Sequence, residues 1–379
     1  MILLLHNRYR TLGGEERVVD DLLRVIPEHL GEPAELLERR SDELSRADAA
    51  RGLLRGGLDP GEVGAAVRRT GARVVHAHNV HPAFGWRALA AARAAGARTV
   101  LHLHQYRLVC AVGTCLDPDG LDCTRCHGRD TTPGLLRRCR GSLPDAAVYA
   151  AGLARWSGRL VAEADALVTP SRFTLDRLHQ LGAPLAGREV HVIANPVAVP
   201  ELRADPVSGT FALCSARLAP DKGVDVAIEA CARAGVPLVV TGHGPQETEL
   251  RALATRLGAD VRFAGRVSDA ELAQLRAGAA LGIVPSRFAE TFGLSAAEMM
   301  ACGLPVAATR VGALTDLLPD EDLVPPGDVA ALATLVTARY GDAASGANAV
   351  ATYTPGAPLL GLTGVDVTGT FAGTSSVPF

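Results

Sequence analysis

Two cations and two acids stand at spacings that suit an elongated polar ligand. Lys222 is the only lysine in the chain, and it follows Arg217 by five residues. All other members of the 38 lysines and arginines are arginines, and a compact ammonium is not equivalent to a planar guanidinium at a phosphate. Glu290 and Glu298 lie further along the chain. The cations suit a diphosphate, and the two carboxylates suit different hydroxyls of the same ligand.

Each of these patterns also has a structural interpretation. Arg217 and Lys222 would equally suit a solvated loop. Ser295 and Glu298 match a capping box, which needs no ligand. Gly242 and Gly244 form a tight turn after an expected strand, but a lone Gly-x-Gly is weak evidence and the fuller dinucleotide fingerprint is missing.

Four histidines end two neighbouring expected strands. They are His76 and His78 in one strand and His102 and His104 in the next. Alternate residues of a strand share a face, so each pair points one way. His104 is nearest the end of its strand and is the best candidate to reach a ligand, as a donor to a hydroxyl or in proton transfer. A packed, hydrogen-bonded histidine is the ordinary alternative, and a zinc hydrolase is another, although His-Glu-x-x-His is absent.

The cysteines of the first half have a symmetric spacing. Twelve, two and twelve residues separate Cys110, Cys123, Cys126 and Cys139. A central Cys-x-x-Cys with two outer thiols predicts a tetrahedral structural zinc site. Cys115 is an alternative outer ligand, and buried or free thiols are the alternative to metal binding.

Bulk properties exclude several classes of protein. A net charge of −3 argues against a general nucleic-acid binder, and 4% aromatic residues are few for base stacking. No apolar run is long enough to span a bilayer, and the first residues resemble a strand rather than a signal peptide. These properties predict a cytoplasmic protein whose eight cysteines are thiols or metal ligands.

Short β-branched or leucine-rich runs alternate with longer helical patterns. The alternation predicts parallel sheets with helices on both faces, and it occurs twice, around a proline-rich joint at about 195–207. The expected strands span residues 2–6, 74–78, 99–104, 166–169, 190–194, 210–215, 237–241, 261–264, 281–284 and 305–309. The expected helices span residues 15–30, 85–95, 173–181, 224–234, 246–257 and 269–277, and a further helix begins near residue 295.

We therefore predict an α/β fold of two doubly wound, Rossmann-like domains facing a central cleft. Residues 1–200 form the first domain, with a cysteine-containing insert at 105–140, and residues 201–339 form the second. Ligands of such sheets lie beyond the carboxyl ends of the strands. The tail 340–379 has no lysine, arginine or glutamate, and its composition favours disorder.

These motifs, in this order, resemble the family 4 glycosyltransferases, which are retaining enzymes of the two-domain GT-B fold. The second half matches through the Arg217 and Lys222 pair, the Gly242-x-Gly turn and the Glu290-x7-Glu298 loop. The first half matches through the following stretches: Gly13-Gly14, His78-Asn79, residues 103–110, Thr169-Pro170-Ser171 and Asn195-Pro196. The resemblance covers about residues 1–337, and the cysteine insert resembles one bacterial subgroup. The tail departs from the family, which usually ends in basic amphipathic helices that return to the first domain.

The resemblance implies a role for each matching position. Arg217 and Lys222 would hold the diphosphate of a UDP- or GDP-sugar, and Glu298 would bind the ribose. Glu290 would orient the donor sugar. The remaining implied contacts are His104 at the reacting face of the sugar, Gly14 at the diphosphate, and the turn of Gly242 and the backbone of Phe292, Gly293 and Leu294 on the donor side. No divalent metal would be needed for catalysis.

The resemblance implies a hexosyltransferase (EC 2.4) that moves the sugar to a hydroxyl of a sugar, a lipid-linked or a small-molecule acceptor, in cell-surface glycan or secondary-metabolite synthesis. A sugar-nucleotide epimerase and a non-catalytic sugar-nucleotide-binding protein are alternatives within the fold, and a zinc or redox module at 105–140 is one outside it. Arginines at 137, 138, 140, 155 and 159 suit either a lipid phosphate at a membrane surface or a solvated helix face. The sequence itself does not identify the sugar, the base or the acceptor.

Overall fold

The computed structural model describes residues 1–10, 13–198 and 200–346. These residues form two compact units. The first runs from Met1 to Pro196 apart from Gly120–Asp122, and the second begins at Val197. Each unit contains one six-stranded sheet in which all pairings are parallel, which confirms the predicted α/β architecture. The predicted tail lies outside the described residues from 347 onward.

The first sheet has the strand order β2-β1-β3-β4-β5-β6. Its strands are β1 (Ile2–Arg8), β2 (Ala34–Arg40), β3 (Val74–Ala77), β4 (Arg98–His102), β5 (Ala166–Thr169) and β6 (Val190–Val192). The chain passes from β1 outward to β2 and then returns to β3 on the other side of β1. This reversal creates a crevice beyond the carboxyl ends of β1 and β3, where ligands of doubly wound sheets bind.

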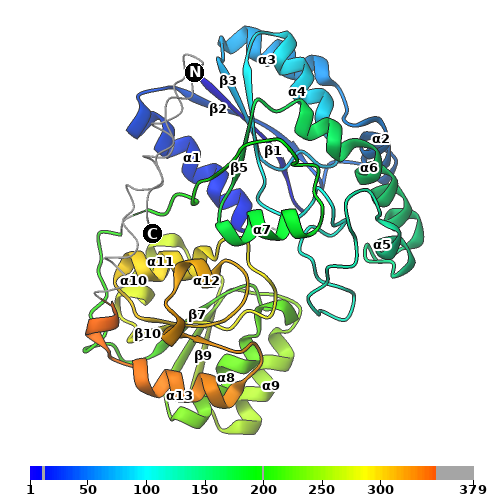
Figure 1. Cartoon of the computed structure of the whole chain (residues 1–379). Helices are drawn as coiled ribbons and strands as arrows, with labels where there is room; N and C mark the ends of the chain where they lie inside the picture. Colours follow the sequence, from blue (N-terminus) through cyan, green and yellow to red (C-terminus); the bar gives the residue numbers. More distant parts are fainter. Residues whose placement is uncertain (11–12, 199, 347–379) are drawn as a thin grey trace. The chain divides into compact units, whose positions relative to one another are not determined.

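Helices cover both faces of this sheet (Figure 1). Their bounds are α1 (Gly14–Leu30), α2 (Arg46–Arg55), α3 (Pro60–Thr70), α4 (Gly85–Ala94), α5 (Thr132–Leu136), α6 (Leu143–Ala162) and α7 (Arg172–Gln180). Leu3 and Leu5 point into a core shared with Val63, Val67 and Leu160 of α3 and α6. The alternate residues of β1 point to the opposite face, because successive side chains of a strand alternate.

Strand register places the histidines on that opposite face. Leu4 pairs with His76, and His76 pairs with Val100. Residues that pair across parallel strands point the same way, as do residues two apart on one strand. His78 and His102 therefore point to the same side as His76, and the predicted alternation explains their clustering.

The second sheet has the order β12-β11-β10-β7-β8-β9. Its strands are β7 (Ala212–Ser215), β8 (Leu238–Thr241), β9 (Val261–Gly265), β10 (Leu281–Val284), β11 (Val306–Thr309) and β12 (Leu323–Val324). If β7 to β12 are numbered 1 to 6 and the order is read from β9, this is the 3-2-1-4-5-6 pattern of a dinucleotide-binding fold. The strand order reverses between β7 and β10.

Figure 1 shows α8, α9 and α13 on one face of the second sheet and α10 and α11 on the other. The bounds of these helices and of the short ones are α8 (Val224–Ala234), α9 (Glu247–Leu257), α10 (Asp269–Ala277), α11 (Leu294–Cys302), α12 (Leu314–Leu317), α13 (Val329–Arg339), η1 (Pro220–Lys222) and η2 (Asp320–Asp322). The strands and α8 bury a core that includes Ala212, Val240, Ile283 and Ile228. Tyr340, the first residue of the predicted tail, packs against this core.

The predicted elements recur with small shifts at their ends. β4 ends at His102, two residues before the predicted end, so His104 lies in the loop. The pattern missed two of the four edge strands, β2 and β12. It also missed the helices α2, α3, α5, α6, α12 and α13. β2 has the sequence AELLERR and every residue is only partly buried, so it lacks the apolar run by which the central strands were found.

Candidate functional site

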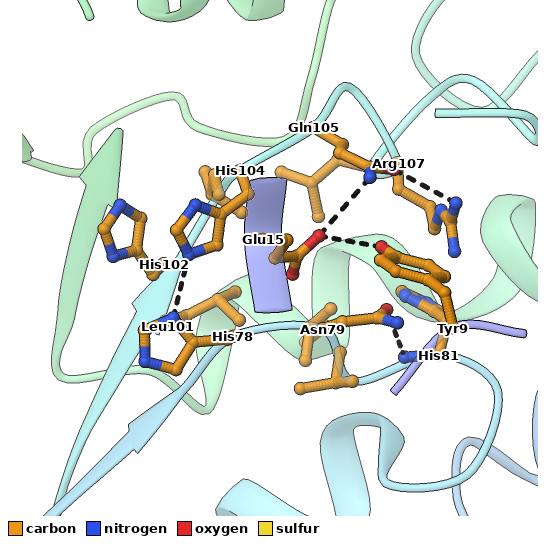
Figure 2. A pocket seen from close by; sticks show the side chains of 14 residues that line it. Tyr9, Glu15, His78, Asn79, His81, Leu101, His102, His104, Gln105 and Arg107 are labelled. Atoms are coloured by element: carbon orange, nitrogen blue, oxygen red, sulfur yellow. Dashed lines mark hydrogen bonds between the residues drawn. The ribbon is translucent and has the colours of Figure 1, made fainter. Parts of the chain in front are cut away.

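The first unit has a pocket where β1, β3 and β4 end, at the reversal of its strand order. We call it the strand-end pocket. Its volume is about 40 Å³, which is room for a few water molecules. It is lined by Tyr9, Glu15, His78, Asn79, Val80, His81, Leu101, His102, Leu103, His104, Gln105, Arg107, Leu108 and Leu160 (Figure 2).

Glu15 is the acid of the strand-end pocket. Tyr9 donates its hydroxyl to Glu15 Oε2 at 2.8 Å, and Gln105 Nε2 donates to the same oxygen at 3.3 Å (Figure 2). Burial raises the pKa of Glu15, although hydrogen bonding from Tyr9 and the charge of Arg107 act against the rise. The Arg107 guanidinium lies 5.3 Å from the centre of the Tyr9 ring. The pocket therefore sets a carboxyl, a phenol and a guanidinium side by side.

Imidazoles form the opposite wall (Figure 2). His78 Nδ1 and His104 Nε2 lie 2.8 Å apart, so one ring donates to the other. The ring of His102 stacks on that of His104 with centroids 3.8 Å apart. Burial lowers the pKa of all three well below the usual range, and neighbouring imidazoles lower it further. These rings are neutral at pH 7 and offer both donors and acceptors.

Three of the buried histidines also have the arrangement of metal ligands. His76, His78 and His102 each offer a ring nitrogen within 4.8 Å of the other two. Within the part of the chain that the structure describes, theirs is the only group of three potential ligands at that spacing. Burial lowers the pKa of His76 to about 4, which leaves the ring in the neutral form that binds metals.

The start of α1 lies beside the strand-end pocket. Gly14 is its first residue and follows the N-cap Gly13. Glu16 accepts hydrogen bonds from the N–H groups of Tyr9 and Gly13 at 2.9 and 2.8 Å. Burial by itself would raise the pKa of Glu16, but the His6 ring, with its Nε2 3.7 Å away, and the hydrogen bonds from these two N–H groups lower it overall. An ionised acid thus fixes the turn from which Gly14 would approach an anion.

The second unit brings Lys222 and Glu290 together. Lys222 Nζ lies 2.7 Å from Glu290 Oε1, and Ser286 Oγ donates to the same oxygen at 2.7 Å. The ammonium also lies 4.3 Å from the centre of the Phe288 ring. Lys222 follows β7 and Glu290 follows β10, so this ion pair bridges the reversal of the second strand order. We call it the Lys222–Glu290 pair.

Arg217 follows the same strand but makes a different contact. Its Nη2 lies 3.1 Å from Asp221 Oδ2, and the side chain is 53% exposed. A guanidinium that is half exposed keeps most of its hydration and is able to turn toward an incoming phosphate. Arg217 therefore pairs with Asp221 and takes no part in the Lys222–Glu290 pair, although it is close to Lys222 in the sequence.

Glu298 has a partner on another helix. It lies in α11 and forms an almost fully buried ion pair with Arg276 of α10. The capping-box interpretation of Ser295 and Glu298 is wrong, because the N-cap of α11 is Gly293. Ser295 Oγ instead donates to the backbone oxygen of Ser215 at 3.0 Å and ties α11 to the end of β7.

The remaining predicted donor-side positions are backbone features. Phe292 is buried, Gly293 has φ +92°, and Leu294 begins α11. The first N–H groups of a helix have no intrahelical acceptor, and they favour anions. Gly242 has φ +114°, and a Cβ there would lie 2.0 Å from the carbonyl oxygen of Ala216. Only glycine fits this close approach between the ends of β8 and β7.

Sequence reasoning found some members of these two sites and missed others. His104 lines the strand-end pocket, and Glu290 meets Lys222. Tyr9 was missed, and Glu15, Gln105 and Arg107 were not assigned to a site. Gln105 and Arg107 follow β4 directly, so their position after a central strand was the available signal.

Two family models match the chain. One, described as "Glycosyl transferase 4-like domain", matches residues 6–196. The other, described as "Glycosyl transferases group 1", matches residues 209–342. Together the models cover both sites.

Curated relatives match over shorter stretches. The D-inositol 3-phosphate glycosyltransferase of Acidothermus cellulolyticus is 42% identical over 131 residues, which cover 30% of this chain and 29% of the relative. The phosphatidyl-myo-inositol mannosyltransferase of Mycobacterium leprae is 34% identical over 174 residues, which cover 41% of this chain and 46% of the relative. The chain thus matches less than half the length of these two relatives.

Solved structures resemble the chain over nearly its whole length. Anabaena HepE in complex with UDP and glucose has a TM-score of 0.61 and 19% identity, over 96% of this chain and 98% of that one. Sucrose-phosphate synthase from Thermosynechococcus elongatus has a TM-score of 0.68 and 18% identity, over 96% and 97%. At this identity the likeness shows the fold alone.

Proposed function

We propose a reaction for this chain, which belongs to the family 4 glycosyltransferases because two domain models of that family match residues 6–196 and 209–342. The chain transfers a sugar from a UDP- or GDP-sugar to an acceptor hydroxyl, and the anomeric configuration of the sugar is retained. The Lys222–Glu290 pair carries this proposal. It sets an ammonium and a carboxylate 2.7 Å apart at the strand-order reversal of the second unit, where doubly wound sheets bind nucleotides.

Charge develops on the leaving diphosphate as the sugar departs. In the proposed reaction Lys222, Arg217 and the first N–H groups of α11 bind the diphosphate and stabilise that charge. Such preorganised groups act most strongly where charge appears in the transition state. Glu290, released from Lys222 by the incoming phosphate, accepts hydrogen bonds from hydroxyls of the donor sugar.

The other predicted residues have supporting roles in this proposal. Glu298 binds the ribose hydroxyls, for which it must share its carboxylate with Arg276. The neutral imidazole of His104 contacts the donor sugar, and Glu15 of the same strand-end pocket contacts the acceptor. Gly14 approaches the diphosphate. None of these contacts requires a catalytic metal.

The names of similar proteins narrow the donor and acceptor classes. HepE was crystallised with UDP and glucose, and a Mycobacterium tuberculosis relative is named as GDP-mannose-dependent. Several relatives carry inositol phosphates or phosphatidylinositols in their names. We therefore propose UDP-glucose and GDP-mannose as the first donors to test, and phosphoinositol compounds as the first acceptors.

Turnover of a donor panel tests this function. We expect slow hydrolysis of at least one UDP- or GDP-sugar without acceptor, and proton NMR of the transfer product should show the anomeric configuration of the donor. Binding without turnover would favour the non-catalytic alternative, and an epimerised sugar would favour the epimerase. If no donor were bound or consumed, the proposal would be abandoned.

A lipid-linked acceptor would require contact with a membrane surface. Leu136 and Leu143 are 75% and 51% exposed and flank the exposed Arg138, a combination that suits an anionic lipid interface. No helix in the described part of the chain is both long and apolar enough to cross a bilayer.

Vesicle flotation measures this contact. We expect the protein to float with phosphatidylglycerol vesicles but not with neutral phosphatidylcholine vesicles, and Leu136→Glu to weaken flotation at least threefold. Leu257→Glu, at a 45% exposed leucine of α9, is the matched control. Equal flotation of both variants would argue against this membrane contact.

A further inference from the structure

Five cysteines from separate parts of the loop that follows β4 line one small cavity of the first unit. Its volume is about 20 Å³, which is room for one water or one ion and for no larger ligand. The cysteines are Cys110, Cys115, Cys123, Cys126 and Cys139. Leu116, Pro133 and Leu181 also line the cavity.

The loop backbone holds the cysteines in place. Cys110 N–H donates to the carbonyl of Tyr106 at 2.8 Å, Cys123 N–H to that of Cys115 at 2.8 Å, and Cys139 N–H to that of Gly134 at 3.0 Å. Gly134 is buried, and a Cβ there would lie 3.4 Å from the sulfur of Cys126. The thiols are thus positioned by hydrogen bonds and close packing rather than by chance proximity.

The electrostatics of the cavity favour a bound cation. The five cysteine side chains meet at one cavity of about 20 Å³, so thiolates there repel one another unless a cation lies among them. Arg125 and Arg137 border the cavity, and Arg125 Nη1 lies 3.6 Å from the sulfur of Cys123. Both guanidiniums also pair with Asp117, at 3.3 and 3.0 Å, so they offset only part of the negative charge of a tetrathiolate site.

We propose that Cys110, Cys123, Cys126 and Cys139 bind one Zn²⁺ in a tetrahedral site. Four thiolates in tetrahedral geometry suit zinc in a structural role. Binding forms four Zn–S bonds and releases the remaining thiol protons to solvent, with no change of oxidation state.

The sulfur atoms have to draw closer to take up the metal. In the described residues, no three of these sulfurs lie within 4.8 Å of one another, whereas four sulfurs bound tetrahedrally at Zn–S distances of about 2.3 Å lie roughly 3.8 Å apart. Binding therefore tightens the cysteine loop, and this tightening couples the metal to the strand-end pocket.

Two residues of the strand-end pocket lie at the start of the same loop. Arg107 Nη2 donates to the carbonyl of Val112 at 3.2 Å and to Gln105 Oε1 at 3.0 Å. Tyr106 N–H donates to the carbonyl of Gly113 at 2.9 Å. Zinc would thus position Gln105 and Arg107 beside Glu15 without touching the ligand of the pocket.

Metal analysis of the purified full chain tests the proposal directly and does not depend on activity. We expect about one zinc per chain by mass spectrometry of the metal content, and loss of at least four fifths of it in Cys126→Ala and Cys139→Ala. Cys231→Ala is the matched control, because Cys231 is equally free of disulfides but lies in the core of the second unit. Cobalt reconstitution of the wild type should give the visible absorption of a tetrahedral thiolate site, and this readout remains if a variant fails to fold.

Other results would overturn the proposal. Zinc that persists in both cysteine variants but is lost in His78→Ala would place the metal at the histidine group. Iron in place of zinc would contradict the metal assigned. A mass two daltons below the reduced chain, with no metal present, would indicate a disulfide, for which Cys110 and Cys115 are the candidates.

Discussion

At the scale of the residue, the chain places its single lysine between a carboxylate and an aromatic ring. Lys222 Nζ reaches Glu290 Oε1 and also lies over the Phe288 ring. A guanidinium at this place would have to fit its fork between the ring and the carboxylate. The identity of the side chain, and not only its charge, therefore matters for the proposed reaction.

Lys222→Arg tests this point. We expect kcat/KM for the accepted donor to fall by about 10–100-fold, a loss of about 1.4–2.8 kcal/mol of transition-state binding. Steady-state kinetics should show the loss mainly in kcat. Arg251→Lys, at an exposed arginine of α9 that pairs with Glu247, is the control and should leave the rate unchanged. Equal rates for Lys222→Arg and the wild type would show that only charge is needed.

At the scale of the element, the sequence predicts the frame of each site better than its contacts. The central strands were found because their buried apolar runs alternate with helices, and the loops after them hold His104, Lys222 and Glu290. The Lys222–Glu290 pair was not predictable in detail, since its members are 68 residues apart and no local pattern encodes their distance. The partner of Glu298, Arg276, was missed for the same reason.

Loop geometry at the end of β8 makes a separate prediction. Gly242→Ala places a methyl group 2.0 Å from the Ala216 carbonyl oxygen at φ +114°, so the ends of β7 and β8 must separate. We expect a loss of about 3 kcal/mol or more in the stability of the second unit. Hydrogen exchange of peptides from β7 and β8 reports this loss.

Gly258→Ala provides the control for this prediction. Gly258 has φ +60° and no atom within 4 Å of an added Cβ, so only backbone strain of about 1 kcal/mol is expected. Similar protection factors in the two variants would show that the approach of Ala216 is not what requires glycine.

At the scale of the whole molecule, the stability of the first unit depends on pH. The first unit buries His76 and partly buries His81, and desolvation lowers their pKa values to about 4 and about 3. The unfolded chain takes up these protons near pH 6.5, whereas the folded unit does not. Stability therefore rises with pH between about 4 and 6.5, and it is lost as pH falls through that window, by about 1.4 kcal/mol per pH unit for each histidine.

Both tryptophans, Trp86 and Trp156, belong to the first unit, so their fluorescence follows its unfolding in urea. We expect His76→Leu to lower the slope of the unfolding free energy against pH between about pH 4.5 and 6. The decrease should correspond to about one proton fewer taken up on unfolding. His29→Leu, at a 48% exposed histidine, should leave the slope unchanged. Parallel curves for His76→Leu and the wild type would contradict a neutral buried His76.

The central claim is that the Lys222–Glu290 pair opens to receive the diphosphate of a nucleotide-linked sugar. Calorimetric titration of UDP, GDP and their sugars into the wild type, Lys222→Ala and the control Arg251→Ala measures this most directly. We predict that one nucleotide binds to the wild type and the control with the same Kd, and that Lys222→Ala weakens it at least tenfold, about 1.4 kcal/mol. Equal affinity in all three proteins, or no binding to any of them, would contradict the claim.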